Sequence, residues 1–110
     1  MKLDRNIDGG HGNKYCLIKN RELEQLRDKD GYFPERVADA LLTLVEAGVI
    51  DWGCTPETEF FVIRLKDRNA GAALAGYAAK AREDDPEYAF QIADLADRSG
   101  ENHPFCKKPD

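Results

Sequence analysis

The sequence predicts an α+β fold: a small, mostly antiparallel sheet of about three strands, with helices packed on one face. Two observations support this prediction. Residues 59–66 read EFFVIRLK, in which an apolar row of side chains alternates with a second row that becomes basic, as in a half-buried strand. Directly after it, small and apolar side chains recur at helical spacing over residues 70–81, which predicts a helix that can approach its packing partner closely.

The strand over residues 59–66 is expected to hold the core. Asp67 follows it and is predicted to cap the next helix, because its carboxylate can accept from unpaired N–H groups of the first turn. The face predicted to be buried carries Phe61, Ile63 and Leu65, and the opposite face carries Phe60, Val62, Arg64 and Lys66.

Four elements are predicted before this strand. Residues 14–19 form a first strand, and residues 21–27 form a short helix that ends near Gly31. A second helix begins at Pro34, carries an apolar stripe, and ends at Gly48, a residue free to adopt positive φ. Residues 49–52 form a second strand, which pairs with the strand over residues 59–66 as an antiparallel hairpin.

After the alanine-rich helix, the run Asp84-Asp85-Pro86-Glu87 predicts a helix start, with Asp85 as the cap and Pro86 in the first position. Ser99-Gly100 ends that helix. The expected organisation is one domain over residues 1–110, with a flexible N-terminal segment at 1–13 and a tail at 101–110.

Charge and composition exclude several function classes. The chain has 110 residues and a formal net charge of -5, which argues against non-specific nucleic-acid binding. No apolar run approaches the ~20 residues needed to cross a bilayer, so no membrane association and a cytoplasmic location are expected. Three cysteines without framework spacing favour a reducing compartment.

A glycine-rich loop near the N-terminus is the first candidate binding element. It spans residues 9–14 and presents backbone N–H groups, which suit an anion or a nucleotide. A turn without any ligand is the competing interpretation, since the spacing matches neither a P-loop nor a dinucleotide fingerprint. The candidate ligand-binding residues here are Gly10, His11, Asn13, Lys14 and Tyr15.

Basic residues at the end of the central strand and in the tail form the second candidate. If the tail folds back, they converge on a small anionic ligand, with aromatic neighbours as a stacking surface. Solvated surface charge is the competing interpretation. The candidate residues are Arg64, Lys66, Arg68, Phe105, Lys107 and Lys108.

Metal and catalytic chemistry are weakly supported by the residues. His103 and Cys106 have the spacing of half a zinc site, but structural zinc normally shows two such pairs. No nucleophile elbow or paired zinc-type motif is present in the sequence. We therefore expect no metal, no cofactor and no enzymatic activity.

Four segments together resemble small uncharacterised proteins of tailed bacteriophages and prophages. They are NKYCLIK after the glycine-rich turn, EFFVIRLKDRNAGAALAGYA, DDPEYAFQIADLADRSG and HPFCKKPD. The resemblance implies a phage-type setting in a host cytoplasm, and no residue role comes with it.

The function expected from this setting is non-enzymatic binding that counters host defence. The protein would sequester a small anionic, nucleotide-type immune signal, or it would bind a host defence protein through an acidic or aromatic surface. A homo-oligomer is left open, because one small domain encloses little ligand by itself. The alternatives are a structural or accessory phage protein, a transcription modulator, or a small metal- or cysteine-dependent enzyme.

Overall fold

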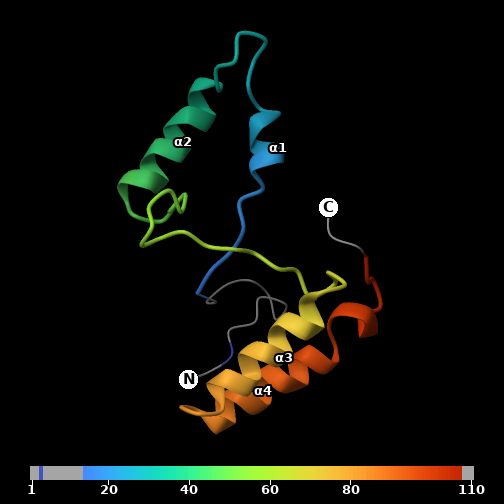
Figure 1. The fold of residues 1–110 in the computed structure, drawn as a ribbon. Helices are drawn as coiled ribbons and strands as arrows, with labels where there is room; N and C mark the ends of the chain where they lie inside the picture. Colours follow the sequence, from blue (N-terminus) through green and yellow to red (C-terminus); the bar gives the residue numbers. More distant parts are fainter. Residues whose placement is uncertain (1–2, 4–13, 108–110) are drawn as a thin grey trace. The chain divides into compact units, whose positions relative to one another are not determined.

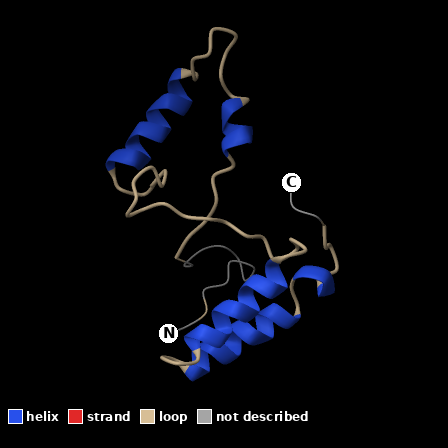
Figure 2. Cartoon of the chain, in the orientation of Figure 1, coloured by secondary structure: helices blue, strands red, loops and turns tan. Residues whose placement is uncertain are grey.

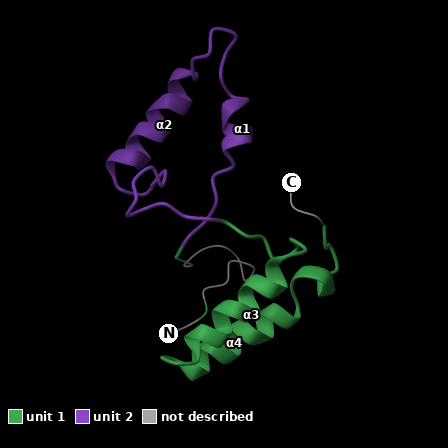
Figure 3. Ribbon diagram, in the orientation of Figure 1, with its two compact units in different colours: residues 1–14, 62–110 green, residues 15–61 purple. Residues whose placement is uncertain are grey.

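The computed structural model describes residue 3 and residues 14–107. The chain divides into two compact units, shown in green and purple in Figure 3. Unit 1 comprises Met1–Lys14 and Val62–Asp110, and unit 2 comprises Tyr15–Phe61. Each unit is described separately below.

The prediction of an α+β fold with a three-stranded sheet is wrong. The described residues form helices, and the β-type pairing among them is one isolated parallel bridge between Asp67 and Lys107. Figure 2 shows helices joined by loops. The helices in chain order are α1 (Asn20–Glu24), α2 (Glu35–Glu46), α3 (Ala70–Ala81), α4 (Pro86–Asp97) and the 3₁₀ helix η2 (Gly100–Asn102).

Unit 1 is built on the hairpin of α3 and α4, which lie side by side in Figure 1. Small side chains let the two helices approach closely, and η2 packs against α3. The predicted apolar stripes of both helices supply this core, although Ala73 and Tyr77 of the α3 stripe are exposed. The buried residues are Ala70, Ala78, Ala89, Ile92, Leu95, Ala96, Ser99 and Gly100.

The start of α4 confirms the sequence prediction. Asp85 is the N-cap residue, its carboxylate accepts from the backbone N–H of Tyr88 at 3.1 Å, and Pro86 occupies the first helical position. The start of α3 differs from the prediction, because Asn69 is the N-cap residue. Asp67 instead accepts from the backbone N–H of Asn69 at 2.8 Å, so its carboxylate stabilises the turn before the helix.

Unit 2 contains α1, α2 and the loops around them. Between the helices, Arg27 pairs with Glu24, donates to the carbonyl oxygen of Gly31 at 2.8 Å, and lies 3.9 Å from the ring centre of Phe33. The Asp28 carboxylate accepts from two backbone N–H groups of the same loop. Local polar contacts therefore give this loop its conformation.

The end of α2 confirms the predicted role of Gly48. Gly48 has a φ of 73°, and its N–H donates to the carbonyl oxygen of Val45 at 3.0 Å. The N–H of Val49 donates to the carbonyl oxygen of Leu44 at 2.9 Å. These two bonds form a Schellman motif, which satisfies helix-end carbonyl groups.

All three predicted strands are extended or looped chain without a β partner among the described residues. Residues 14–19, 49–52 and 59–66 contain no strand, and the predicted hairpin is absent. The chain between the second and third predicted strands does form a turn. In it the backbone N–H groups of Thr55 and Thr58 each donate to the side-chain oxygen of the other residue, and the two side chains are also hydrogen-bonded to each other. A strand needs a neighbour to satisfy its backbone, and alternation of side chains alone supplies none. Phe61 and Ile63, predicted to be buried, are 87% and 40% exposed.

Candidate functional site

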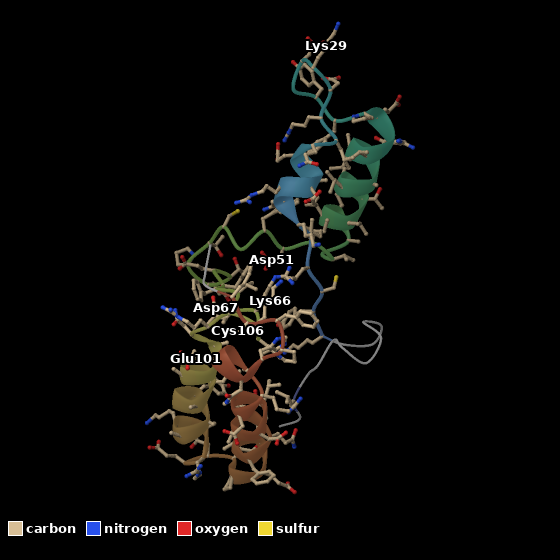
Figure 4. The ribbon with its side chains drawn as sticks, turned by 90° about the vertical axis from the view of Figure 1, so that its right-hand side faces the viewer. Lys29, Asp51, Lys66, Asp67, Glu101 and Cys106 are labelled. Atoms are coloured by element: carbon tan, nitrogen blue, oxygen red, sulfur yellow. The ribbon has the colours of Figure 1, made fainter. Side chains whose placement is uncertain are left out.

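The basic residues at the end of the predicted central strand lie beside the C-terminal segment, within unit 1. The backbone N–H of Lys107 donates to the carbonyl oxygen of Lys66 at 2.9 Å. The carbonyl oxygen of Lys107 accepts from the N–H of Arg68, also at 2.9 Å. Figure 4 labels Lys66, Asp67 and Cys106 in this region. We call Lys66, Arg68 and Lys107 the basic cluster.

A second backbone contact holds the same two segments together. The N–H of Gly100 donates to the carbonyl oxygen of Leu65 at 2.8 Å, at the point where α4 gives way to η2. The C-terminal segment is thus joined to residues 65–68 at two places. The second candidate was conditional on the tail folding back, and the tail does reach these residues. They form turns around the bridge at Asp67 and do not belong to a sheet.

Phe105 lies one turn beyond η2 and is 76% exposed. Its backbone N–H donates to Nδ1 of His103 at 3.0 Å, and the two rings are 6.1 Å apart with a tilt of 51°. Most of the Phe105 residue is therefore accessible to solvent. His103 is half-buried, and its Nδ1 is engaged by the backbone.

The structure describes only some of the other predicted binding residues. Gly10, His11, Asn13 and Lys108 lie outside the described residues. Lys14 is in unit 1 and Tyr15 is in unit 2, and both are exposed. Arg64 and Arg68 are exposed, whereas Lys66 is half-buried.

Unit 2 holds the exposed features that the site prediction missed. None of residues 15–61 is buried, although this unit carries much of the chain's large apolar side chains. We define six of them as the exposed apolar set: Leu42, Leu44, Val45, Trp52, Phe60 and Phe61. The sequence predicts an apolar stripe over residues 34–48. No second long apolar helix is indicated near it in the sequence to cover the stripe, and this is the signal that points to the exposed apolar set.

The Phe60 ring has a specific neighbour within unit 2. A methyl group on Gly53 would overlap the nearest atoms of that ring, so the ring lies directly against the glycine. Gly53 has a φ of 68° and donates its N–H to Asp51 at 2.9 Å. The glycine thus permits both the turn and the position of the ring.

Shifted pKa values are found at Glu24 and Arg27 in unit 2 and at Asp85 and Tyr88 in unit 1. A hydrogen bond from Arg27 lowers the pKa of the Glu24 carboxyl, and the same contact raises the pKa of Arg27. In unit 1, a hydrogen bond with Tyr77 and partial burial raise the pKa of Tyr88. The two tyrosine rings meet edge to face, 6.3 Å apart.

The cysteines and acidic residues form no metal-binding group among residues 3 and 14–107. Cys16, Cys54 and Cys106 are free thiols with exposed side chains. None of the helices in the described part of the chain is long and apolar enough to span a bilayer.

Comparisons with known proteins give no relative. No protein-family model, no curated protein and no solved structure matches this chain. The residues themselves therefore carry the functional argument.

Proposed function

We propose that this chain is a non-enzymatic binding protein that docks on a partner protein through the exposed apolar set of unit 2. One observation carries the proposal: none of residues 15–61 is buried, yet α2 has a complete apolar stripe. Contiguous apolar patches mark interaction surfaces in soluble proteins, and we propose that the exposed apolar set forms such a patch. A unit of this size without a buried core gains little stability from burial by itself, and a partner would supply the missing burial.

The chemistry of the exposed apolar set suits a protein surface. Three members are the aromatic residues Trp52, Phe60 and Phe61, and aromatic side chains dominate the energy of protein interfaces. The other three lie on α2 and can meet an apolar groove or helix. Docking of this kind needs no enclosed pocket. The resemblance to phage proteins suggests the class of partner, which is a host defence protein.

Photo-crosslinking tests the proposal. Benzoylphenylalanine replaces Phe61, which is 87% exposed in unit 2, or Phe90, which is 75% exposed on α4 in unit 1. We expect a covalent adduct with a bacterial protein from the Phe61 position and none from the Phe90 position. Adding Leu44→Asp to the Phe61 probe should remove the adduct, because a buried charge at the interface is costly.

The Phe90 position is the control, and two outcomes would contradict the proposal. Adducts of equal yield at Phe61 and Phe90 indicate non-specific adhesion and contradict the proposal. No adduct at Phe61, with the protein folded by circular dichroism, contradicts it as well.

A second candidate function is sequestration of a small anionic ligand at the basic cluster. The backbone bonds of Lys107 to Lys66 and Arg68 favour it, since they hold three basic residues from two distant segments together. Phe105, which is mostly exposed, is near in sequence and suits a nucleotide base.

Calorimetric titration with cyclic dinucleotides and ADP-ribose tests this second function. Lys66→Glu should remove the heat of binding, whereas Lys29→Glu, the same charge change in unit 2, should retain it. No heat with any of these nucleotides rules it out.

A further inference from the structure

The net charge of the protein is concentrated in one unit. Residues 15–61 contain ten acidic and five basic side chains, a formal net charge of -5, which equals the charge of the whole chain. The remaining residues contain eleven acidic and eleven basic side chains and are neutral overall. The unit with the exposed apolar set is therefore also the acidic unit.

The acidic residues on α2 accompany its apolar stripe. Glu35, Asp39 and Glu46 are exposed, and none of them forms an ion pair with a described residue. At 100° per residue they lie within about 60° of Leu42 around the helix axis, at one edge of the apolar stripe. An apolar surface with uncompensated acids around it attracts basic groups at the rim of an interface.

We propose that the partner segment docking on unit 2 is cationic and amphipathic: a polypeptide with an apolar face and Lys or Arg beside it. This inference rests on the proposed function and names the chemistry of its partner. The apolar face covers the exposed apolar set, and the basic groups meet the α2 acids. Electrostatic attraction of this kind raises the association rate and makes binding dependent on salt.

The same charges disfavour the other occupants of this surface. A second copy of the chain would bring two units of charge -5 together, and like charges facing each other reduce affinity. Nucleic acid and anionic lipid surfaces carry the same sign as unit 2 and are repelled. A basic protein segment remains the occupant that both the apolar and the charged features suit.

Fluorescence of Trp52 supplies a direct test, because it is the only tryptophan of the chain and belongs to the exposed apolar set. The probe is a synthetic Leu/Lys peptide with one apolar helical face, added to the full chain. Two further peptides serve as comparisons: a scrambled Leu/Lys peptide without an apolar face, and a Leu/Glu peptide with the same pattern. We expect a shift of Trp52 emission with the amphipathic Leu/Lys peptide, and binding that weakens as salt rises.

Matched charge variants locate the effect. Combined Glu35→Lys, Asp39→Lys and Glu46→Lys should weaken binding about tenfold or more, in line with three modest surface pairs. Combined Asp84→Lys, Asp97→Lys and Glu101→Lys makes the same change of net charge in unit 1 and should leave binding unchanged. Circular dichroism establishes the helix content of both variants, and the salt series on the unaltered protein tests the inference without any substitution.

Several results would overturn the inference. They are equal binding of the Leu/Glu peptide, equal binding of the scrambled peptide, equal loss in both triple variants, and self-association of the chain that excludes the Leu/Lys peptide. If the Phe61 probe captures a protein that the Leu/Lys peptide does not displace, the inference fails and the proposed function stands. If neither the probe nor the peptide engages unit 2, both fail.

Discussion

Gly100 lies so close to Gly71 that a methyl group on Gly100 would stand 3.0 Å from the Gly71 backbone nitrogen. It would also stand 2.9 Å from the carbonyl oxygen of Arg68. Gly100 has a φ of +64° and is buried at the junction of α4 and η2. The end of α4 and the start of α3 therefore meet backbone against backbone at this glycine.

Gly100→Ala should destabilise the protein by about 1–3 kcal/mol. A positive φ is strained for alanine, and the added methyl group meets backbone atoms that cannot rotate away. Urea unfolding followed by circular dichroism measures the free energy of unfolding. An unchanged value would show that the chain around residue 100 moves freely.

Gly76→Ala should have the opposite effect and is the matched comparison. Gly76 lies inside α3, and a methyl group there meets nothing within 4 Å. Alanine is a better helix former than glycine by roughly 0.5–1 kcal/mol, so the free energy of unfolding should rise by that amount. A decrease in the same urea experiment would mean that α3 needs flexibility at this position.

Ile92→Ala should cost about 2–4 kcal/mol, because Ile92 is the large β-branched side chain buried between α3 and α4. Phe90→Ala, two residues earlier on α4, removes a larger side chain that is mostly exposed. Its effect should stay within about 0.5 kcal/mol. Thermal unfolding of the two variants side by side checks the assignment of the core, and a larger loss from Phe90→Ala would contradict it.

Tyr88 should make stability fall at alkaline pH. The hydrogen bond with Tyr77, together with burial, raises the pKa of Tyr88 above its usual 10.0. The stabilising effect is complete below the unfolded-state pKa and is lost as pH rises through the folded-state pKa. Between these two pKa values the unfolded chain binds fewer protons than the folded chain, so the free energy of unfolding falls as pH rises.

Urea unfolding from pH 8 to pH about 11 measures this dependence. Tyr88→Phe should flatten the alkaline slope relative to the unaltered protein. Tyr32→Phe removes an exposed tyrosine and should retain the slope, while lysine titration remains common to all three proteins. Equal slopes for both variants would contradict the role of the tyrosine pair.

Helices were predictable from the sequence because their signals are local. Asp85 and Pro86 mark the start of α4, Gly48 marks the end of α2, and the apolar spacing of α4 identifies Ile92 as buried. Each signal depends on residues within one or two turns. The structure confirms these helix ends and the burial of Ile92, and none of the signals depends on a residue far away in the sequence.

The strands were not predictable in the same way, because a sheet depends on partners far away in sequence. Phe61 and Ile63 have the alternation of a half-buried strand, yet no neighbouring strand is present among the described residues. The pairing that does occur joins Asp67 to Lys107, forty residues later. Alternation predicts an extended chain and cannot identify its partner.

The candidate site was predictable in part. The composition made Lys66, Arg68 and Lys107 a candidate site on the condition that the tail folds back. The backbone hydrogen bonds of Lys107 with Lys66 and Arg68 meet that condition. The acidic character of unit 2 does not follow from the net charge of the whole chain, because that number says nothing about position along the sequence. The charge of residues 15–61 alone shows the imbalance.

The contacts of Gly100 with Leu65 and of Lys107 with Lys66 also bear on the order of folding. The α3–α4 hairpin joins neighbouring segments, so its contacts close a short loop and we expect them to form first. The two backbone bonds join residues 35 and 41 positions apart, and closing those longer loops costs more chain entropy. Unit 1 is therefore expected to reach its final form in two steps, with the C-terminal segment docking last.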